Sequence, residues 1–160
     1  MARQMQVDGM EEISRMLEQM EESAPAVAAQ ALYEGAKVMR EAIQEGAEAI
    51  RTEPFRYARN GTRLPSPEEK EIVVAAGVGV AKFDKNGSEV DTSVGYRNAG
   101  YAELGGKTKP VPQIVNAINS GTSFMQKQPF VRKAERNGRQ RAEAAITRRI
   151  QEAYDNMNKK

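Results

Sequence analysis

The side chains able to do chemistry in this chain form a short list, because its 160 residues include no cysteine, no histidine and no tryptophan. Without cysteine there is no thiol nucleophile, disulfide or thiolate metal ligand. Without histidine the usual general base and the commonest metal ligand are missing. An ordinary hydrolase or metalloenzyme is therefore a poor interpretation, and we expect no catalytic residue, cofactor or metal.

The remaining candidates for chemistry are carboxylate pairs and a glycine-lysine run. Glu11 with Glu12, Glu21 with Glu22 and Glu68 with Glu69 are neighbours in sequence, and adjacent residues on a helix point in different directions. The run "GGKTK" at 105–109 resembles the end of a phosphate-binding loop. It lacks the first glycine at the required spacing and is followed by Pro-Val-Pro instead of a helix. We interpret it as a basic turn.

Charge is distributed unevenly along the chain. Residues 1–53 hold five Lys/Arg against eleven Asp/Glu, whereas residues 127–160 hold ten against four. The two ends attract each other, either as antiparallel helices within one subunit or as contacts between subunits. The basic end could also contact nucleic-acid phosphates. We favour an acidic protein partner, because the chain itself supplies one. The cations concerned are Arg132, Lys133, Arg136, Arg139, Arg141, Arg148 and Arg149.

Size and hydropathy predict one domain, 1–160, in a cytosol-like compartment. The length suits a single core. No apolar run approaches the roughly 18 residues that cross a bilayer, and the first residues lack the apolar centre of a signal peptide.

Periodicity predicts two helices in the first third of the chain. Asp8 and Glu11 fit a capping box for a first helix, Gly9–Glu22. Ser23 caps a second helix that continues to about Arg51 along a stripe of small and apolar residues. The Pro-, Gly- and Arg-rich residues 52–70 have no period, and we expect a long loop there that orders on assembly.

The remaining residues predict a small sheet and two further helices. Two β-rich runs, "EIVVAAGVGVAKF" and "EVDTSVGYR", flank a tight turn at Asn86-Gly87, and a third strand is expected at Tyr101–Leu104. A short helix follows over Gln113–Ser120. The stretch "MQKQPFVRKAERN" then opens a last long helix with Gly138 as its weak point. The expected class is α+β, with a small antiparallel sheet packed against long N-terminal and C-terminal helices.

The order of these signals resembles the neck and tail-component proteins of long-tailed double-stranded-DNA bacteriophages. The resemblance rests on the layout and on Tyr101, Glu103, Gly105, Gln128, Pro129, Phe130, Arg132 and Ala134. It implies a non-catalytic virion protein that is assembled in the host cytoplasm. Such a protein forms a homo-oligomeric ring between the head connector and the tail terminator or tail tube, and DNA passes through the ring without sequence-specific binding. The segment "EPFRYARNGTRLPSP" departs from the family's usual loop.

From this resemblance and the charges we expect two sets of residues to carry the function. The motif and core set is Tyr101, Glu103, Gly105, Pro129 and Phe130. The subunit or partner interface set is Arg132, Lys133, Arg136, Phe55, Arg56, Tyr57, Lys107 and Lys109. The alternative function is a small non-catalytic nucleic-acid-binding protein that uses the basic last helix. Salt dependence of DNA binding would separate the two.

Overall fold

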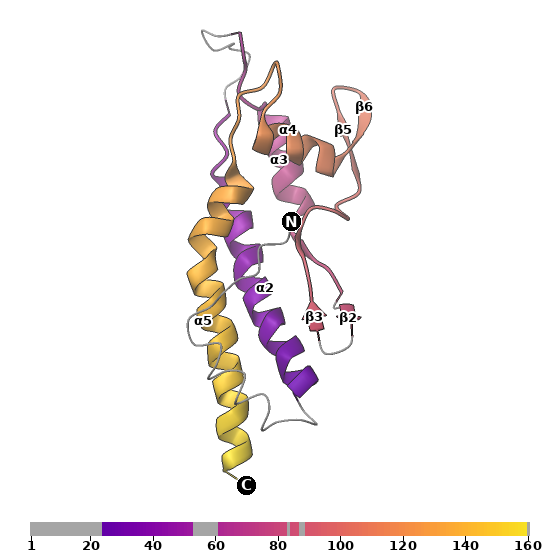
Figure 1. The fold of residues 1–160 in the computed structure, drawn as a ribbon. Helices are drawn as coiled ribbons and strands as arrows, with labels where there is room; N and C mark the ends of the chain where they lie inside the picture. The colour runs from indigo at the N-terminus through magenta and orange to yellow at the C-terminus, as the bar shows by residue number, and fades with distance from the viewer. Residues whose placement is uncertain (1–23, 53–60, 83, 87–88, 160) are drawn as a thin grey trace.

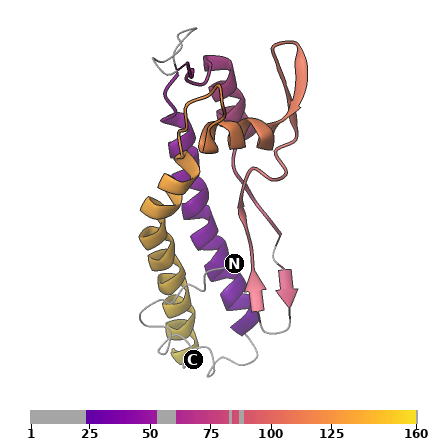
Figure 2. The ribbon, with the colours of Figure 1, turned by 45° about the horizontal axis from the view of Figure 1, so that its top comes forward.

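A computed structural model describes residues 24–52, 61–82, 84–86 and 89–159. Two long helices, α2 (Ala24–Glu48) and α5 (Phe130–Asn158), lie side by side and antiparallel (Figure 1). The shorter elements lie along one side of this pair, mostly near the end of α2 and the start of α5 (Figure 2). They are α3 (Pro67–Ala76), β1 (Gly79–Val80), β2 (Asp84–Asn86), β3 (Glu89–Asp91), β4 (Val94–Gly95), β5 (Tyr101–Leu104), β6 (Lys107–Pro110) and α4 (Val111–Ser120). The α+β class is confirmed. The expected helix Gly9–Glu22 lies outside the described residues.

Small side chains set the distance between α2 and α5. A Cβ atom added to Gly138 would lie 2.9 Å from the Cβ of Ala42, and one added to Gly46 would lie 3.2 Å from the carbonyl oxygen of Phe130. Both distances are shorter than ordinary contact, so the helices can approach this closely only because these positions lack side chains. Gly138, expected as the weak point of the last helix, is buried against Ala42 of α2, so its lack of a side chain is also a packing requirement.

The acidic and basic parts of the chain were expected to pair either within one subunit or between subunits, and the structure has α2 and α5 as antiparallel helices within one subunit. Charge nevertheless contributes little to this helix pairing. Among the described residues the single ion pair between the two helices is Arg141 to Glu45, at 4.0 Å. Both side chains are more than half exposed, and exposed pairs contribute about 0–1 kcal/mol. The register of the pair therefore depends on small-residue packing, and most charges remain on its outer surface.

Helix α3 corrects two expectations, because residues 67–70 are not loop and residues 71–76 are not strand. Ser66 is the N-cap: its hydroxyl accepts a hydrogen bond from the Glu69 N–H at 3.1 Å, and the Glu69 carboxylate accepts one from the Ser66 N–H at 2.8 Å. Pro67 occupies the first turn, and Gly77, with φ of 68°, ends the helix. This reciprocal capping box begins a helix even though the β-branched residues that follow favour strand.

The loop expected before α3 is also partly paired. Arg63 forms an isolated parallel bridge with Met125, through its own N–H to the Phe124 carbonyl and from the Gln126 N–H to its carbonyl, both at 2.8 Å. Its guanidinium makes two 2.7 Å bonds to the carboxylate of Glu69. These contacts tie the segment before α3 to the segment before α5. Residues 53–60 lie outside the described residues.

The described strands form three two-stranded antiparallel ladders and not one continuous sheet. The first two ladders are successive parts of one hairpin. Gly79 pairs with Gly95, and Asp84 pairs with Asp91, so the first strand holds one more residue between the ladders than its partner, as in a β-bulge. Asn86 pairs with Glu89, which confirms an antiparallel hairpin here, whereas Gly87 of the expected turn lies outside the described residues.

The third ladder confirms the strand at Tyr101–Leu104 and corrects the loop expected after it. Lys107–Pro110 is a strand, β6, paired with β5 across Gly105 and Gly106. These glycines have φ of 59° and 73°, the positive values that a two-residue hairpin turn requires at both positions. The short helix expected over Gln113–Ser120 is confirmed as α4, although it begins earlier, at Val111, within Pro-Val-Pro. "GGKTK" is nevertheless a turn and a strand, and it does not open that helix.

The core lies where α2, α3, α4 and the start of α5 meet. Phe130 is 5% exposed, and its ring packs edge-to-face on Tyr96 with 6.3 Å between centroids. Around them lie Ala42, Ile43, Ala47, Ile50, Val73, Val111, Ile114, Val115, Ile118, Met125 and Ala134. No helix in the described part of the chain is both long enough and apolar enough to span a membrane.

Candidate interaction site at the start of α5

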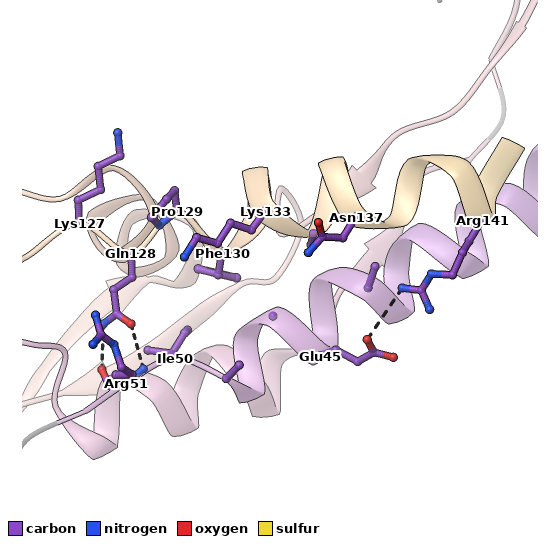
Figure 3. A pocket seen from close by; sticks show the side chains of 14 residues that line it. Glu45, Ile50, Arg51, Lys127, Gln128, Pro129, Phe130, Lys133, Asn137 and Arg141 are labelled. Carbon is purple, nitrogen blue, oxygen red and sulfur yellow. Dashed lines mark hydrogen bonds and ion pairs between the residues drawn. The ribbon is translucent and has the colours of Figure 1, made fainter. Parts of the chain in front are cut away.

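The side chain of Gln128 joins the end of α2 to the start of α5. Its amide nitrogen donates to the Arg51 carbonyl and its amide oxygen accepts from the Arg51 N–H, both at 2.9 Å (Figure 3). Its backbone N–H donates to the Ile118 carbonyl at 2.8 Å, near the end of α4. One glutamine therefore ties together three segments that are far apart in sequence. This role explains why a glutamine precedes Pro129 and Phe130.

Helix α5 begins without a side-chain cap of its own. Pro129 is the N-cap residue, and its side chain makes no cap hydrogen bond. Instead, the Val131 N–H donates to the side-chain oxygen of Asn119 at 3.2 Å, so α4 supplies the acceptor. Proline has no N–H of its own and is tolerated at such a position. The start of α5 is thus fixed by the Phe130 ring, by Gln128 and by Asn119.

A groove of about 520 Å³ runs between α2 and α5 beside this start (Figure 3). Its apolar lining comes from Ala42, Gly46, Ala49, Ile50, Pro129, Phe130 and Ala134. Four cations, Arg51, Lys127, Lys133 and Arg141, line the same groove, together with the single acid Glu45. Gln128 and Asn137 also line it, so the groove combines small apolar side chains with polar ones, and cations predominate among its charged residues.

The expected interface residues are only partly brought together. Arg132, Lys133 and Arg136 are exposed in the first two turns of α5, and none of them forms an ion pair with a residue that the structure describes. Of the three, Lys133 lines the groove. Lys107 and Lys109 lie on β6, in a separate hairpin. Phe55, Arg56 and Tyr57 lie outside the described residues.

The expected motif and core residues divide between the interior and the surface. Phe130 is buried, and Pro129 is half-buried at the N-cap. Tyr101 is 74% exposed, so it is not a core residue, and Glu103 is exposed on the same strand. Strand alternation explains this result: Ala102 and Leu104 face the core, so Tyr101 and Glu103 face away from it. Gly105 has a conformational role in the hairpin turn.

Later in α5 three arginines form ion pairs with two glutamates of the same helix. Arg139 pairs with Glu143 at 3.1 Å, Arg148 with Glu152 at 3.9 Å and Arg149 with Glu152 at 3.7 Å. These are neighbours on one helical face, at spacings of three or four residues. Arg149 also donates to the side chain of Gln30 on α2. The uncompensated positive charge of α5 is consequently concentrated at its start.

Among the residues that the structure describes, two titratable groups, Glu69 and Tyr96, have shifted pKa values. Burial raises the pKa of Glu69, but hydrogen bonds from Arg63 and Ser66 and the charge of Arg63 outweigh it, so the net pKa is lowered. Burial raises the pKa of Tyr96 to about 12, and its hydroxyl has no hydrogen-bond partner among the described residues. No three His, Cys, Asp or Glu side chains in the described residues gather as a metal site would require.

Sequence reasoning missed the contacts that fix this site. The pair Ser66-x-x-Glu69 was readable as a capping box, and it would have predicted α3. By contrast, no local pattern marks Arg51 as the partner of Gln128, since 77 residues separate them. The same holds for Asn119 as the cap of α5.

Comparison with known proteins adds no assignment to this geometry. No model of a protein family, no curated protein and no solved structure matches the chain.

Proposed function

We propose that this protein is a structural component of the neck or tail of a long-tailed double-stranded-DNA bacteriophage. In this proposal it forms a homo-oligomeric ring that joins the head connector to the tail and lets DNA pass. The resemblance described above suggests the class of protein. The observation that carries the proposal is the group of exposed cations at the start of α5, Arg132, Lys133 and Arg136, which form no ion pair within the described part of the chain.

The position of these cations supports contact with an acidic protein surface. Arg132 and Lys133 lie in the first turn of α5, where the positive end of the helix dipole disfavours an exposed cation by roughly a few tenths of a kcal/mol. The junction at Gln128 fixes the turn that presents them. An exposed cation held at an unfavourable position is expected where a partner compensates for it.

A ring also needs two unlike faces on each subunit, because its contacts are heterologous. The start of α5 supplies a positive face. Exposed glutamates on α2, among them Glu41 and Glu48, and the acidic residues 1–23 supply negative charge elsewhere on the chain. Assembly by such contacts requires no catalytic residue.

The test is removal of the gene from the phage or prophage that carries it, followed by electron microscopy of the lysate. We expect DNA-filled heads and finished tails that remain separate, with joining restored by the gene supplied in trans. Normal plaques and joined particles without the gene would refute the proposal.

Nucleic-acid binding is the second candidate, favoured by the same unpaired cations. A protein that contacts several phosphates loses affinity steeply with salt. We expect little DNA binding by the purified chain at physiological salt. Tight binding with a steep salt dependence, lost on reversing Arg132 and Lys133, would favour this candidate instead. The ion-paired arginines later in α5 count against a continuous phosphate-binding face.

A further inference from the structure

We infer that the groove beside the start of α5 receives the acidic N-terminal segment, residues 9–22, of a second copy of this chain. The inference rests on the proposed ring for its biological role, since a contact that passes from one copy to the next is what a ring needs. The proposed contact lies between residues 9–22 of one copy and the groove beside the start of α5 in the next.

The groove suits an amphipathic segment with acidic edges. Its floor is formed largely by small residues, Ala42, Gly46 and Ala49, beside Ile50, which leaves room for larger side chains from outside. Its rim carries four cations and one acid. Of the cations, only Arg141 has an ion-pair partner among the described residues, the weak contact with Glu45.

Residues 9–22 have the complementary pattern. Met10, Ile13, Leu17 and Met20 recur at helical spacing, so the sequence predicts one apolar face. The other residues of the segment include five glutamates and a single cation, Arg15. Methionine is unbranched and adaptable, and it fits a shallow, irregular apolar floor.

The length of residues 9–22 favours the groove of a second copy over the groove of the same chain. The groove begins at Ala42, which lies 18 residues beyond the start of α2 at Ala24, or roughly 27 Å along the helix at 1.5 Å per residue. A helix over residues 9–22 is roughly 21 Å long and joins α2 through Ser23. Folded back along α2 of its own chain, it would end before the groove.

Disulfide trapping tests this contact cleanly, because the natural chain has no cysteine. One full-length variant carries Met16→Cys, next to the predicted apolar face, and the other carries Ala49→Cys, an exposed position that lines the groove. A C-terminal tag on one variant distinguishes the mixed dimer by size. After mild oxidation of the mixture we expect a 16–49 cross-link, identified by peptide mass spectrometry.

The matched control replaces Ala49→Cys with Asn156→Cys, an exposed position near the other end of α5. We expect at least a tenfold higher yield for the groove position. Adding Lys133→Glu and Arg141→Glu to the Ala49→Cys chain should lower that yield at least tenfold. Adding Glu18→Lys and Glu21→Lys to the Met16→Cys chain should then partly restore the yield. Circular dichroism of each variant checks that it is folded.

Three results would overturn the inference. One is a yield no higher than that of the Asn156 control. Another is an internal disulfide in the Met16→Cys/Ala49→Cys double variant at high dilution, because it would place the segment on its own groove. The third is a cross-link indifferent to the charge reversals. A trans cross-link in a chain whose deletion leaves phage joining normal would refute the proposed function alone.

Discussion

The start of α5 and the rest of this arginine-rich helix differ in how their cations are paired. Beyond the first two turns the cations form ion pairs with glutamates of the same helix, as in Arg139 to Glu143 and, in the second half, Arg148 to Glu152. In the first turns Arg132, Lys133 and Arg136 have no such partner among the described residues. Yet this first half is the better anchored, through Phe130, Gln128 and Asn119.

The difference shows that the exposed charge at the start of α5 is not a consequence of loose structure. The charge is presented by the part of the helix that is fixed to α2 and α4 at once, where side chains can be held ready for a partner. The second half packs on α2 through small residues and could tolerate solvated, self-paired charge. Four predictions test this contrast, in order of decreasing effect on stability.

Replacing Phe130 with alanine should reduce the free energy of unfolding by about 3–5 kcal/mol, the usual cost of removing a buried aromatic side chain. The ring is 5% exposed and contacts Tyr96. Urea unfolding of the purified chain measures the change. The matched variant in the second half is Ile150→Ala, also buried, for which we expect about 2 kcal/mol. Equal costs at the two positions would remove the contrast in anchoring.

Replacing Gly138 with alanine should destabilise the helix pair even though alanine favours helix by about 1 kcal/mol. The new methyl group would lie 2.9 Å from the Cβ of Ala42, which cannot rotate away, and overpacking of this kind costs about 1–3 kcal/mol. Thermal unfolding measures the net loss. The double variant Gly138→Ala/Ala42→Gly should recover part of it in a double-mutant cycle. A higher melting temperature for Gly138→Ala alone would show that the helices separate freely there.

Stability should fall at high pH because of Tyr96. Its pKa of about 12 in the folded chain exceeds the value of about 10 expected when unfolded, so the folded state holds the proton more tightly. This stabilisation is complete below about pH 10 and is lost as the pH rises from there toward 12.

The matched variant is Tyr96→Phe, which keeps the ring against Phe130 and removes the titrating group. At neutral pH it should be as stable as the natural chain or more stable, because the buried hydroxyl has no partner among the described residues. Between about pH 9 and pH 11 the natural chain should lose roughly 1 kcal/mol relative to the variant. Parallel pH curves for the two proteins would show that Tyr96 ionises as readily as an exposed tyrosine.

Reversing Arg132 and Lys133 to glutamate should change folding least and assembly most. Acidic side chains in the first turn suit the helix dipole, so the free energy of unfolding should rise by a few tenths of a kcal/mol. Complementation of a phage that lacks the gene should nevertheless fail, with separate heads and tails in the lysate.

The matched control reverses Arg148 and Lys159, the same change of charge placed in the second half of α5 and at its C-cap. It should still complement. If both double variants complement equally, the cations at the start of α5 are solvated surface and the contrast between the two halves has no functional meaning.

Much of the local structure of this chain was determined by sequence alone. Three features are patterns among residues a few positions apart, and the structure has all of them: the small-residue stripe of α2, the period of α5 and the strand at Tyr101–Leu104. The antiparallel pairing of β2 with β3 was expected on the same kind of local evidence. Helix α3 also had a local signal in Ser66 and Glu69. That signal competes with the strand preference of Ile72, Val73 and Val74, which follow it in the sequence.

Only the tertiary structure decided how these elements meet. Gln128 bonds to Arg51 across 77 residues, and Arg63 aligns with Met125, contacts whose geometry no local period encodes. The position of Gly138 against Ala42 likewise added a packing requirement to its interpretation as a weak point. The physical reason is that periodicity reports which face of an element is apolar, whereas register and partner depend on closing the whole chain around one core.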